Sequence, residues 1–226
     1  MNDVRLAQEI ASSRIHVEPW PSEMTLKVLV IVISISIWAG LVFSIFGIIY
    51  ALIIGLTLFA AHLLFVAGVR GSAVMVTPEQ FPELYGRIKL LCERAGLEAM
   101  PETYVMQANG SLNALATKFL RSRMIILFSD LLDACEDDPR AQDMIIGHEI
   151  GHLKAGHLDG YWFLLPGLFV PLLGSAYSRA CEYTCDRYGF ALAGNTSSAL
   201  KGLAVLAAGV KYGKRVNYRA FVKQRE

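Results

Sequence analysis

Charged side chains are scarce in this sequence and almost missing from one long stretch. Only 18% of the 226 residues are charged, 54% are hydrophobic, and the mean hydropathy is +0.42. This composition excludes an ordinary soluble domain. Between Leu26 and Val69 the only charged residue is Lys27, and the stretch is about twice the ~20 residues that a helix needs to cross a bilayer. We therefore predict a transmembrane hairpin over 26–69, with helices near 26–43 and 48–69.

Basic residues are also missing where they would indicate other topologies. No basic leader precedes the apolar run, which is longer than the ~7–15 residues of a signal-peptide core, so a cleavable signal is disfavoured. The connection between the two spans has no Lys or Arg, whereas basic residues follow the second span at Arg70, Arg87, Lys89 and Arg94. Positive charges favour the cytoplasmic side. We therefore predict a multi-pass protein, in a bacterial inner membrane, with both chain ends and the domain that follows the second span in the cytoplasm.

The sequence has no C-x-x-C spacing, so its four cysteines are expected to be free thiols. Residues 1–25 are predicted to be a cytoplasmic segment, and residues 70–210 a compact domain. Residues 211–226 form a basic tail that suits an anionic membrane surface or is solvated and partly disordered. Membrane lipid is therefore an expected partner and nucleic acid is not. The oligomeric state cannot be derived from the sequence.

The domain over 70–210 carries mixed helix and strand signals. Thr77-Pro78 is typical of a helix start, and apolar residues at helical spacing continue to Gly96. Short buried strands are predicted over 103–106 and 124–128, with a possible third, exposed strand over 112–119. Asp138-Pro139 predicts the start of another helix. The expected fold is α+β and mostly helical, with a small sheet.

The sequence His-Glu-Ile-Gly-His, from His148 to His152, is the strongest chemical signal. On a helix, His148 and His152 lie one turn apart on the same face and can bind one metal ion, while Glu149 can take a proton from an attacking water. Imidazole nitrogen suits Zn²⁺, and a carboxylate suits proton transfer. A helix in which two histidines share a face by chance is the alternative. The charged residues around this helix disfavour a position inside the bilayer.

A catalytic zinc usually takes a third protein ligand. The metzincin extension is excluded, because Ala155 and Leu158 stand where it needs glycine and histidine. Glu182 is the better candidate, and Asp186, one helical turn later, could accept a hydrogen bond from a liganding imidazole. By itself this segment is more typical of a surface helix with scattered charges, and the unfilled ligand position is what favours Glu182.

These two motifs together resemble the HtpX-like membrane zinc metallopeptidases, gluzincins related to the CAAX prenyl proteases and the OMA-type proteases. The resemblance covers roughly residues 77–192 and includes the segment Asn113-Ala114-Leu115-Ala116-Thr117. It implies a gluzincin-like domain in which one Zn²⁺ per chain is bound by His148, His152 and Glu182.

The same resemblance implies that Glu149 is the catalytic base. It also implies that the strand with Asn113, Ala114 and Leu115 pairs with an extended polypeptide substrate. The donor to the tetrahedral oxyanion is not assigned; Arg179, Tyr183 and Tyr188 are candidates. Cys181 and Cys185 depart from the small or apolar residues that are more usual beside this glutamate.

The apolar segment over 161–177 has no charged residue. A single crossing would place Glu182 and His152 on opposite sides of the membrane, and two crossings would need more residues. If both residues bind one zinc, the segment must be re-entrant, interfacial or packed on the domain, and Pro166 and Pro171 favour a broken helix. His157 is interpreted as a helix-end residue rather than a ligand.

Two functions are compatible with these features. The first is a membrane-anchored zinc endopeptidase that cleaves membrane or unfolded proteins, as in protein quality control. The second is a catalytically silent scaffold or chaperone that binds unfolded polypeptide. The presence of Glu149 favours the enzyme, because a scaffold needs no base.

Overall fold

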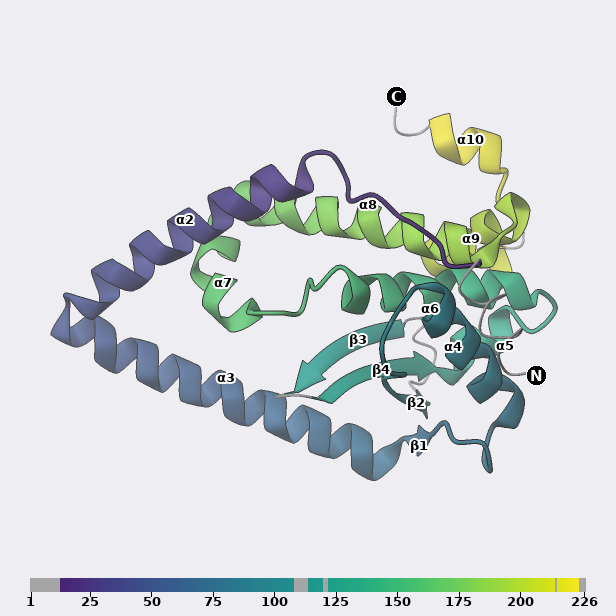
Figure 1. Ribbon diagram of the computed structural model, residues 1–226, viewed down its shortest axis with the longest axis horizontal. Helices are drawn as coiled ribbons and strands as arrows, with labels where there is room; N and C mark the ends of the chain where they lie inside the picture. Colours follow the sequence, from purple (N-terminus) through teal and green to yellow (C-terminus); the bar gives the residue numbers. More distant parts are fainter. Residues whose placement is uncertain (1–12, 108–113, 120–121, 214, 224–226) are drawn as a thin grey trace, which may run out of the picture.

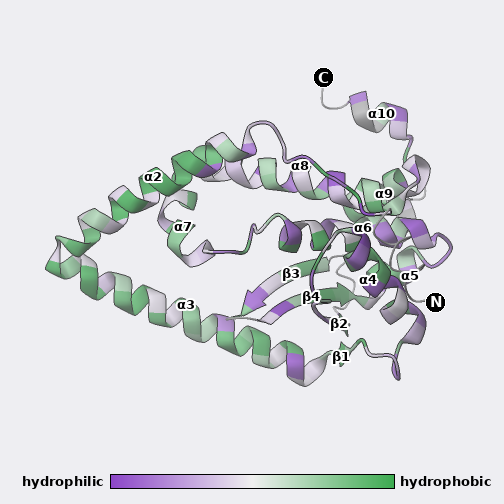
Figure 2. Cartoon of the chain, viewed as in Figure 1, coloured by the Kyte–Doolittle hydropathy of each residue, from purple (hydrophilic) through white to green (hydrophobic). Residues whose placement is uncertain are grey.

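The structure is a computed structural model that describes residues 13–107, 114–119, 122–213 and 215–223 (Figure 1). Two long helices, α2 (Glu23–Val42) and α3 (Ile45–Ser72), form a hairpin whose arms diverge from the turn at Phe43 and Ser44. Both are long and apolar enough to cross a membrane, and Figure 2 shows hydrophobic residues along both. The predicted hairpin is present, and its helices extend three residues beyond the predicted outer ends.

A small mixed sheet lies beside the second half of α3. Its strands are β1 (Val74–Met75), β2 (Glu102–Met106), β3 (Ala114–Phe119) and β4 (Ser122–Phe128), in the order β1-β2-β4-β3. The β2–β4 pair is parallel, and the β1–β2 and β3–β4 pairs are antiparallel. β3 therefore lies at an edge of the sheet, and among the described residues no strand pairs with the other side of its backbone.

Both faces of β4 are buried, and they pack against different parts of the chain. Ile125 and Leu127 belong to the main core with helix α6 (Pro139–Lys154), whereas Met124 and Ile126 pack with Val66 of α3. The two predicted buried strands are confirmed. The prediction that the third strand is exposed is wrong, because Ala114, Ala116 and Thr117 are buried. Residues 112–113 of that prediction lie outside the described residues.

Helix α4 (Pro82–Arg94) begins four residues later than the sequence predicted. The Thr77 hydroxyl accepts a hydrogen bond from the backbone N–H of Gln80, at 3.2 Å, and closes a separate turn. Phe81 has a non-helical φ of −137°, so Pro82, not Pro78, takes the first helical position. A short helix, α5 (Ser129–Ala134), follows the sheet.

The long helices α6 and α8 (Leu173–Ala193) pack closely side by side. Glycines allow this approach. A Cβ atom added to Gly151 would lie 3.1 Å from the Cα of Cys185, and one added to Gly189 would lie 2.4 Å from the carbonyl oxygen of Met144. Helix α9 (Thr196–Gly213) packs against α6, is kinked at Gly209 and runs past the predicted domain boundary at residue 210. The short helix α10 (Tyr218–Lys223) follows.

The apolar segment over 161–177 contains the short helix α7 (Tyr161–Leu168), a turn, and the start of α8. It packs against α2. The Ser34 hydroxyl donates to the carbonyl of Leu164 at 3.1 Å and accepts from the N–H of Gly167 at 3.0 Å. The indole N–H of Trp38 donates to the carbonyl of Phe163 at 2.9 Å. The chain therefore reverses within this segment and brings α8 back beside α6.

Candidate metal centre

Helix α6 holds the two histidines in fixed positions. Its first turn is capped by Asp138, whose carboxylate accepts from the N–H of Ala141 at 3.3 Å, and Pro139 takes the first helical position, as predicted. Buried isoleucines fix the rotation of the helix about its axis. His148 and His152 lie one turn apart, and their ring centroids are 5.1 Å from each other.

Helix α8 brings Glu182 to these two imidazoles. The Nε2 atom of His148 lies 3.1 Å from one carboxylate oxygen of Glu182, and the Nε2 atom of His152 lies 3.6 Å from the other. The Glu182 side chain is about half exposed. Two imidazole nitrogens that each approach an oxygen of one carboxylate form a donor set whose chemistry fits a catalytic zinc ion.

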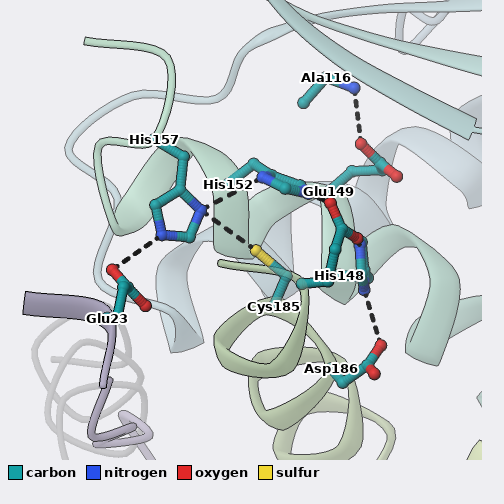
Figure 3. A network of polar contacts seen from close by, with 9 residues as sticks. Glu23, Ala116, His148, Glu149, His152, His157, Cys185 and Asp186 are labelled. Atoms are coloured by element: carbon teal, nitrogen blue, oxygen red, sulfur yellow. Dashed lines mark hydrogen bonds and ion pairs between the residues drawn. The ribbon is translucent and has the colours of Figure 1, made fainter. Parts of the chain in front are cut away.

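Asp186, one turn further along α8, orients His148. Its Oδ1 atom lies 3.0 Å from Nδ1 of His148, and Figure 3 draws this contact. Burial lowers the pKa of His148, but the hydrogen bonds to Asp186 and Glu182 outweigh that effect and raise the pKa to about 10. Nδ1 of His148 donates its hydrogen bond to Asp186, which leaves the Nε2 atom to face Glu182.

Glu149 points from α6 toward the edge strand. Its Oε2 atom accepts a hydrogen bond from the N–H of Ala116 at 2.6 Å, and only 8% of the residue is exposed. Burial raises the pKa of Glu149, while His148 and the Ala116 N–H act in the opposite direction without cancelling it. A carboxyl group with a raised pKa is suited to proton transfer near neutral pH.

These residues lie around one cavity of about 630 Å³ between β3 and α6. The predicted residues Ala114 and Leu115 are part of its wall. Leu158 and Leu206 also line it, although nothing in the sequence connects these leucines with the motif. The full lining consists of Ala114, Leu115, Ala116, Ile145, His148, Glu149, His152, Leu158, Glu182 and Leu206. The predicted residue Asn113 lies outside the described residues.

The candidate oxyanion donors lie elsewhere. Arg179 lines a separate cavity beside α7, and the ring of Tyr183 packs on Trp20 with a centroid distance of 4.6 Å. Tyr188 is buried against the position of Gly151. None of the three is among the residues that line the cavity around Glu149, and their role in stabilising an oxyanion stays a prediction.

A second group of polar side chains lies behind His152 (Figure 3). The Nδ1 atom of His157 is 3.2 Å from Nδ1 of His152, and its Nε2 atom is 3.1 Å from Oε1 of Glu23. His157 does follow the end of α6, as predicted, but its side chain is buried and in contact with the motif. Glu23 precedes it by 134 positions, so sequence spacing could not indicate the pair.

Cys185 also approaches the two motif histidines. Ligand atoms of His148, His152 and Cys185 lie within 4.8 Å of one another, as do those of Glu23, His157 and Cys181. All four cysteines are free. Burial raises the pKa of the Cys185 and Cys181 thiols, which favours their protonated forms over the thiolates that bind metals.

An edge strand above a helix that bears two imidazoles and a buried carboxylate is the arrangement of a metallopeptidase, here with two helices that indicate membrane association. Residues 78–159 match the family model described as Peptidase family M48. The match begins shortly before α4, includes the His148–His152 motif and ends before α7 and α8. It confirms the resemblance to the HtpX-like metallopeptidases. No curated protein and no solved structure matches the chain.

Proposed function

We propose that the chain is a membrane-anchored zinc endopeptidase that binds one Zn²⁺ through His148, His152 and Glu182. The observation that carries this proposal is the approach of both Nε2 atoms to the Glu182 carboxylate, at 3.1 and 3.6 Å. Cys185 is the other candidate for the third ligand. Its buried, protonated thiol makes it the weaker one, whereas Glu182 has a carboxylate that lines the cavity.

The residues of the cavity have separate chemical tasks in this proposal. Zinc, when bound, supplies a Lewis acid that polarises the scissile carbonyl and makes the attacking water more acidic. Glu149 takes the proton from that water and passes it to the leaving amine. The Ala116 N–H that now contacts Glu149 belongs to the edge strand, so substrate and base meet at the same place.

The substrate is an extended polypeptide that adds to the free edge of β3. Strand addition uses backbone hydrogen bonds and therefore needs a segment without fixed tertiary structure. Ala114 and Leu115 line the cavity next to Glu149, and Asn113 precedes them in the chain. These features support the cleavage of unfolded or membrane proteins, which is the chemistry of protein quality control.

The membrane anchor is the α2–α3 hairpin, with the catalytic domain on the cytoplasmic side of a bacterial inner membrane. The basic residues that follow α3 support this orientation. The turn between α7 and α8 also enters the lipid interface, because apolar side chains there are exposed next to α2. Phe169 is 77% exposed and Leu172 is 85% exposed.

Cleavage of unfolded casein by the purified protein in detergent tests the proposal. We expect activity that a zinc chelator removes and added zinc restores. The Glu149→Gln variant should lose at least ~100-fold in rate, because general base catalysis contributes about 10²–10⁴-fold. Glu136→Gln, at an exposed position, is the matched control. Full activity in Glu149→Gln would contradict the mechanism, and a wild type that binds casein without cleaving it would favour the scaffold.

Metal analysis tests the ligand set independently of activity. Glu182→Ala should reduce the zinc content of the purified protein, since one of three ligands is removed. Cys185→Ala should leave the zinc content near one ion per chain. The opposite pattern would assign the third ligand position to Cys185.

A further inference from the structure

A continuous chain of polar contacts runs from the first residue of α2 to the motif helix (Figure 3). Glu23 contacts Nε2 of His157 at 3.1 Å, and Nδ1 of His157 contacts Nδ1 of His152 at 3.2 Å. Glu23 and His157 are only 6% and 8% exposed. Because buried polar groups are stable only with hydrogen-bond partners, this chain of contacts constrains where each proton lies.

The positions of the ring protons of His157 and His152 follow from the hydrogen bonds of the Glu23 carboxylate. One oxygen of Glu23 accepts a hydrogen bond from the Thr184 hydroxyl, which itself accepts from the N–H of Trp20. An ionised carboxylate only accepts hydrogen bonds, so Nε2 of His157 must carry the proton that faces the other oxygen. A neutral His157 then has an unprotonated Nδ1, which lies 3.2 Å from Nδ1 of His152, so the hydrogen between these two nitrogens belongs to His152. The Cys185 thiol, whose sulfur lies 3.4 Å from the same Nδ1 of His157, can add a second, weaker hydrogen bond to it.

We propose that Glu23 and His157 are positioning residues for the metal centre, which fix His152 as the tautomer with its proton on Nδ1. The Nε2 atom of His152 then keeps its lone pair and faces the site shared with Glu182. This proposal rests on the proposed zinc site. It assigns to His157 the task that Asp186 has for His148, with an imidazole and a carboxylate in series in place of one carboxylate.

This arrangement connects the membrane anchor with the metal centre. Glu23 is the first residue of α2, whose later turns pack on α7 and α8. A displacement of the first turn of α2 would remove the acceptor of His157 and release the orientation of His152. The position of the hairpin therefore influences metal affinity without any contact between the hairpin and the metal ligands.

The same residues could instead hold a second metal ion, since Glu23, His157 and Cys181 have ligand atoms within 4.8 Å of one another. The hydrogen bonds argue against this alternative. Both oxygens of Glu23 and both nitrogens of His157 already have partners among the described residues. A second ion would have to displace them, and the number of zinc ions per chain distinguishes the two cases.

Zinc affinity, measured by competition with a chromophoric chelator in the full-length protein, tests the proposal. All variants are made in the Glu149→Gln background, so that the result does not depend on hydrolysis. His157→Phe and Glu23→Ala should each lower the affinity by about 10–100-fold, which is typical for residues that orient metal ligands. Glu23→Gln should lose less, because its amide oxygen can still accept from His157.

Ser34→Ala is the matched control. It removes buried hydrogen bonds between α2 and α7 but touches neither His157 nor the motif, so zinc affinity should not change. Substitution with Co²⁺ supplies a second readout, because the visible spectrum should change in His157→Phe and stay unchanged in Ser34→Ala. A merely structural role of His157 would lower the melting temperature of the metal-free protein and leave that spectrum unchanged.

Three results would overturn the proposal. The first is an unchanged zinc affinity and Co²⁺ spectrum in a folded His157→Phe protein. The second is a stoichiometry of two zinc ions per chain that falls to one in Glu23→Ala. The third is a complete lack of zinc binding by the Glu149→Gln protein, which would also overturn the proposed function. Zinc binding by a wild-type protein that does not cleave casein would contradict the proposed function alone. If neither His157→Phe nor Glu23→Ala folds, Thr184→Val is measured instead. We expect a several-fold loss of zinc affinity in this variant, and an unchanged zinc affinity would contradict the proposal.

Discussion

The two motif histidines are chemically identical, and their surroundings make them different. His148 shares its Nδ1 proton with the carboxylate of Asp186, whereas His152 faces the imidazole of His157. Burial and the neighbouring charge of His148 lower the pKa of His152. A metal ligand must be a neutral imidazole. In the proposed zinc site, the lowered pKa keeps the His152 imidazole neutral, so its tautomer is the property that its neighbours must set.

The buried thiols lead to a prediction about reactivity. Burial, with a smaller contribution from Glu93, raises the pKa of Cys92 to about 12, and Cys135, Cys181 and Cys185 are also buried. Because the thiolate is the reactive form, only ~0.01% of Cys92 is reactive at pH 8. We expect no modification of the native protein by a maleimide within minutes, and modification of all four cysteines in denaturant. The mass of the intact chain measures both, and rapid labelling of the native protein would contradict the burial.

At the scale of elements, the metal centre depends on the distance between α6 and α8. Glu182 and Asp186 reach the histidines only because Gly151 and Gly189 allow the two backbones to approach. Any larger residue at these positions must push the helices apart or force the backbone to shift. The contacts of 3.1 and 3.0 Å from His148 to α8 would then lengthen.

Gly189→Ala tests this dependence. A Cβ atom there would lie 2.4 Å from the carbonyl oxygen of Met144, so we expect a loss of ~1–3 kcal/mol in the free energy of unfolding and a lower zinc affinity. Gly86→Ala is the control, since nothing lies within 4 Å of a Cβ atom in the middle of α4. It should stabilise the protein by roughly 0.5–1 kcal/mol. Chemical unfolding measures both, and equal effects of the two variants would contradict the packing argument.

Local patterns predicted the elements more reliably than the contacts between them. Asp138-Pro139 predicted the start of α6 because a cap and a proline act within one turn. Thr77-Pro78 misled, because a second proline at position 82 competes for the same role. The pairing of Glu182 with the motif could be inferred from helical spacing and an empty ligand position. The contact between Glu23 and His157 could not, since it depends on how α2 packs beside α8.

At the scale of the whole molecule, the two helices of the hairpin pack against two different sides of the rest of the protein. α2 packs on α7 and α8, and the second half of α3 packs on the sheet. The helices therefore diverge from their turn and enclose the elements that carry the site (Figure 1). Helices α6 and α8, which carry the candidate metal ligands, lie between the two arms of this hairpin and extend toward its open end (Figure 1). The segment over 161–177 reverses the chain beside α2, so the topology proposed above places both of its ends on one side of the membrane.

Single cysteines test this topology, because the native thiols are buried and should not react. Phe43 is 91% exposed at the hairpin turn, and Glu98 and Thr196 are exposed before and after the apolar segment. A membrane-impermeant maleimide added to intact cells should label Phe43→Cys alone, and Glu98→Cys and Thr196→Cys only after lysis. Labelling of Glu98→Cys and Thr196→Cys, but not of Phe43→Cys, in intact cells would place the domain on the outer side of the membrane. That result would still agree with a chain that turns back within residues 161–177. Labelling of Glu98→Cys and Thr196→Cys from opposite sides would separate His152 from Glu182, and the two could not bind one zinc ion.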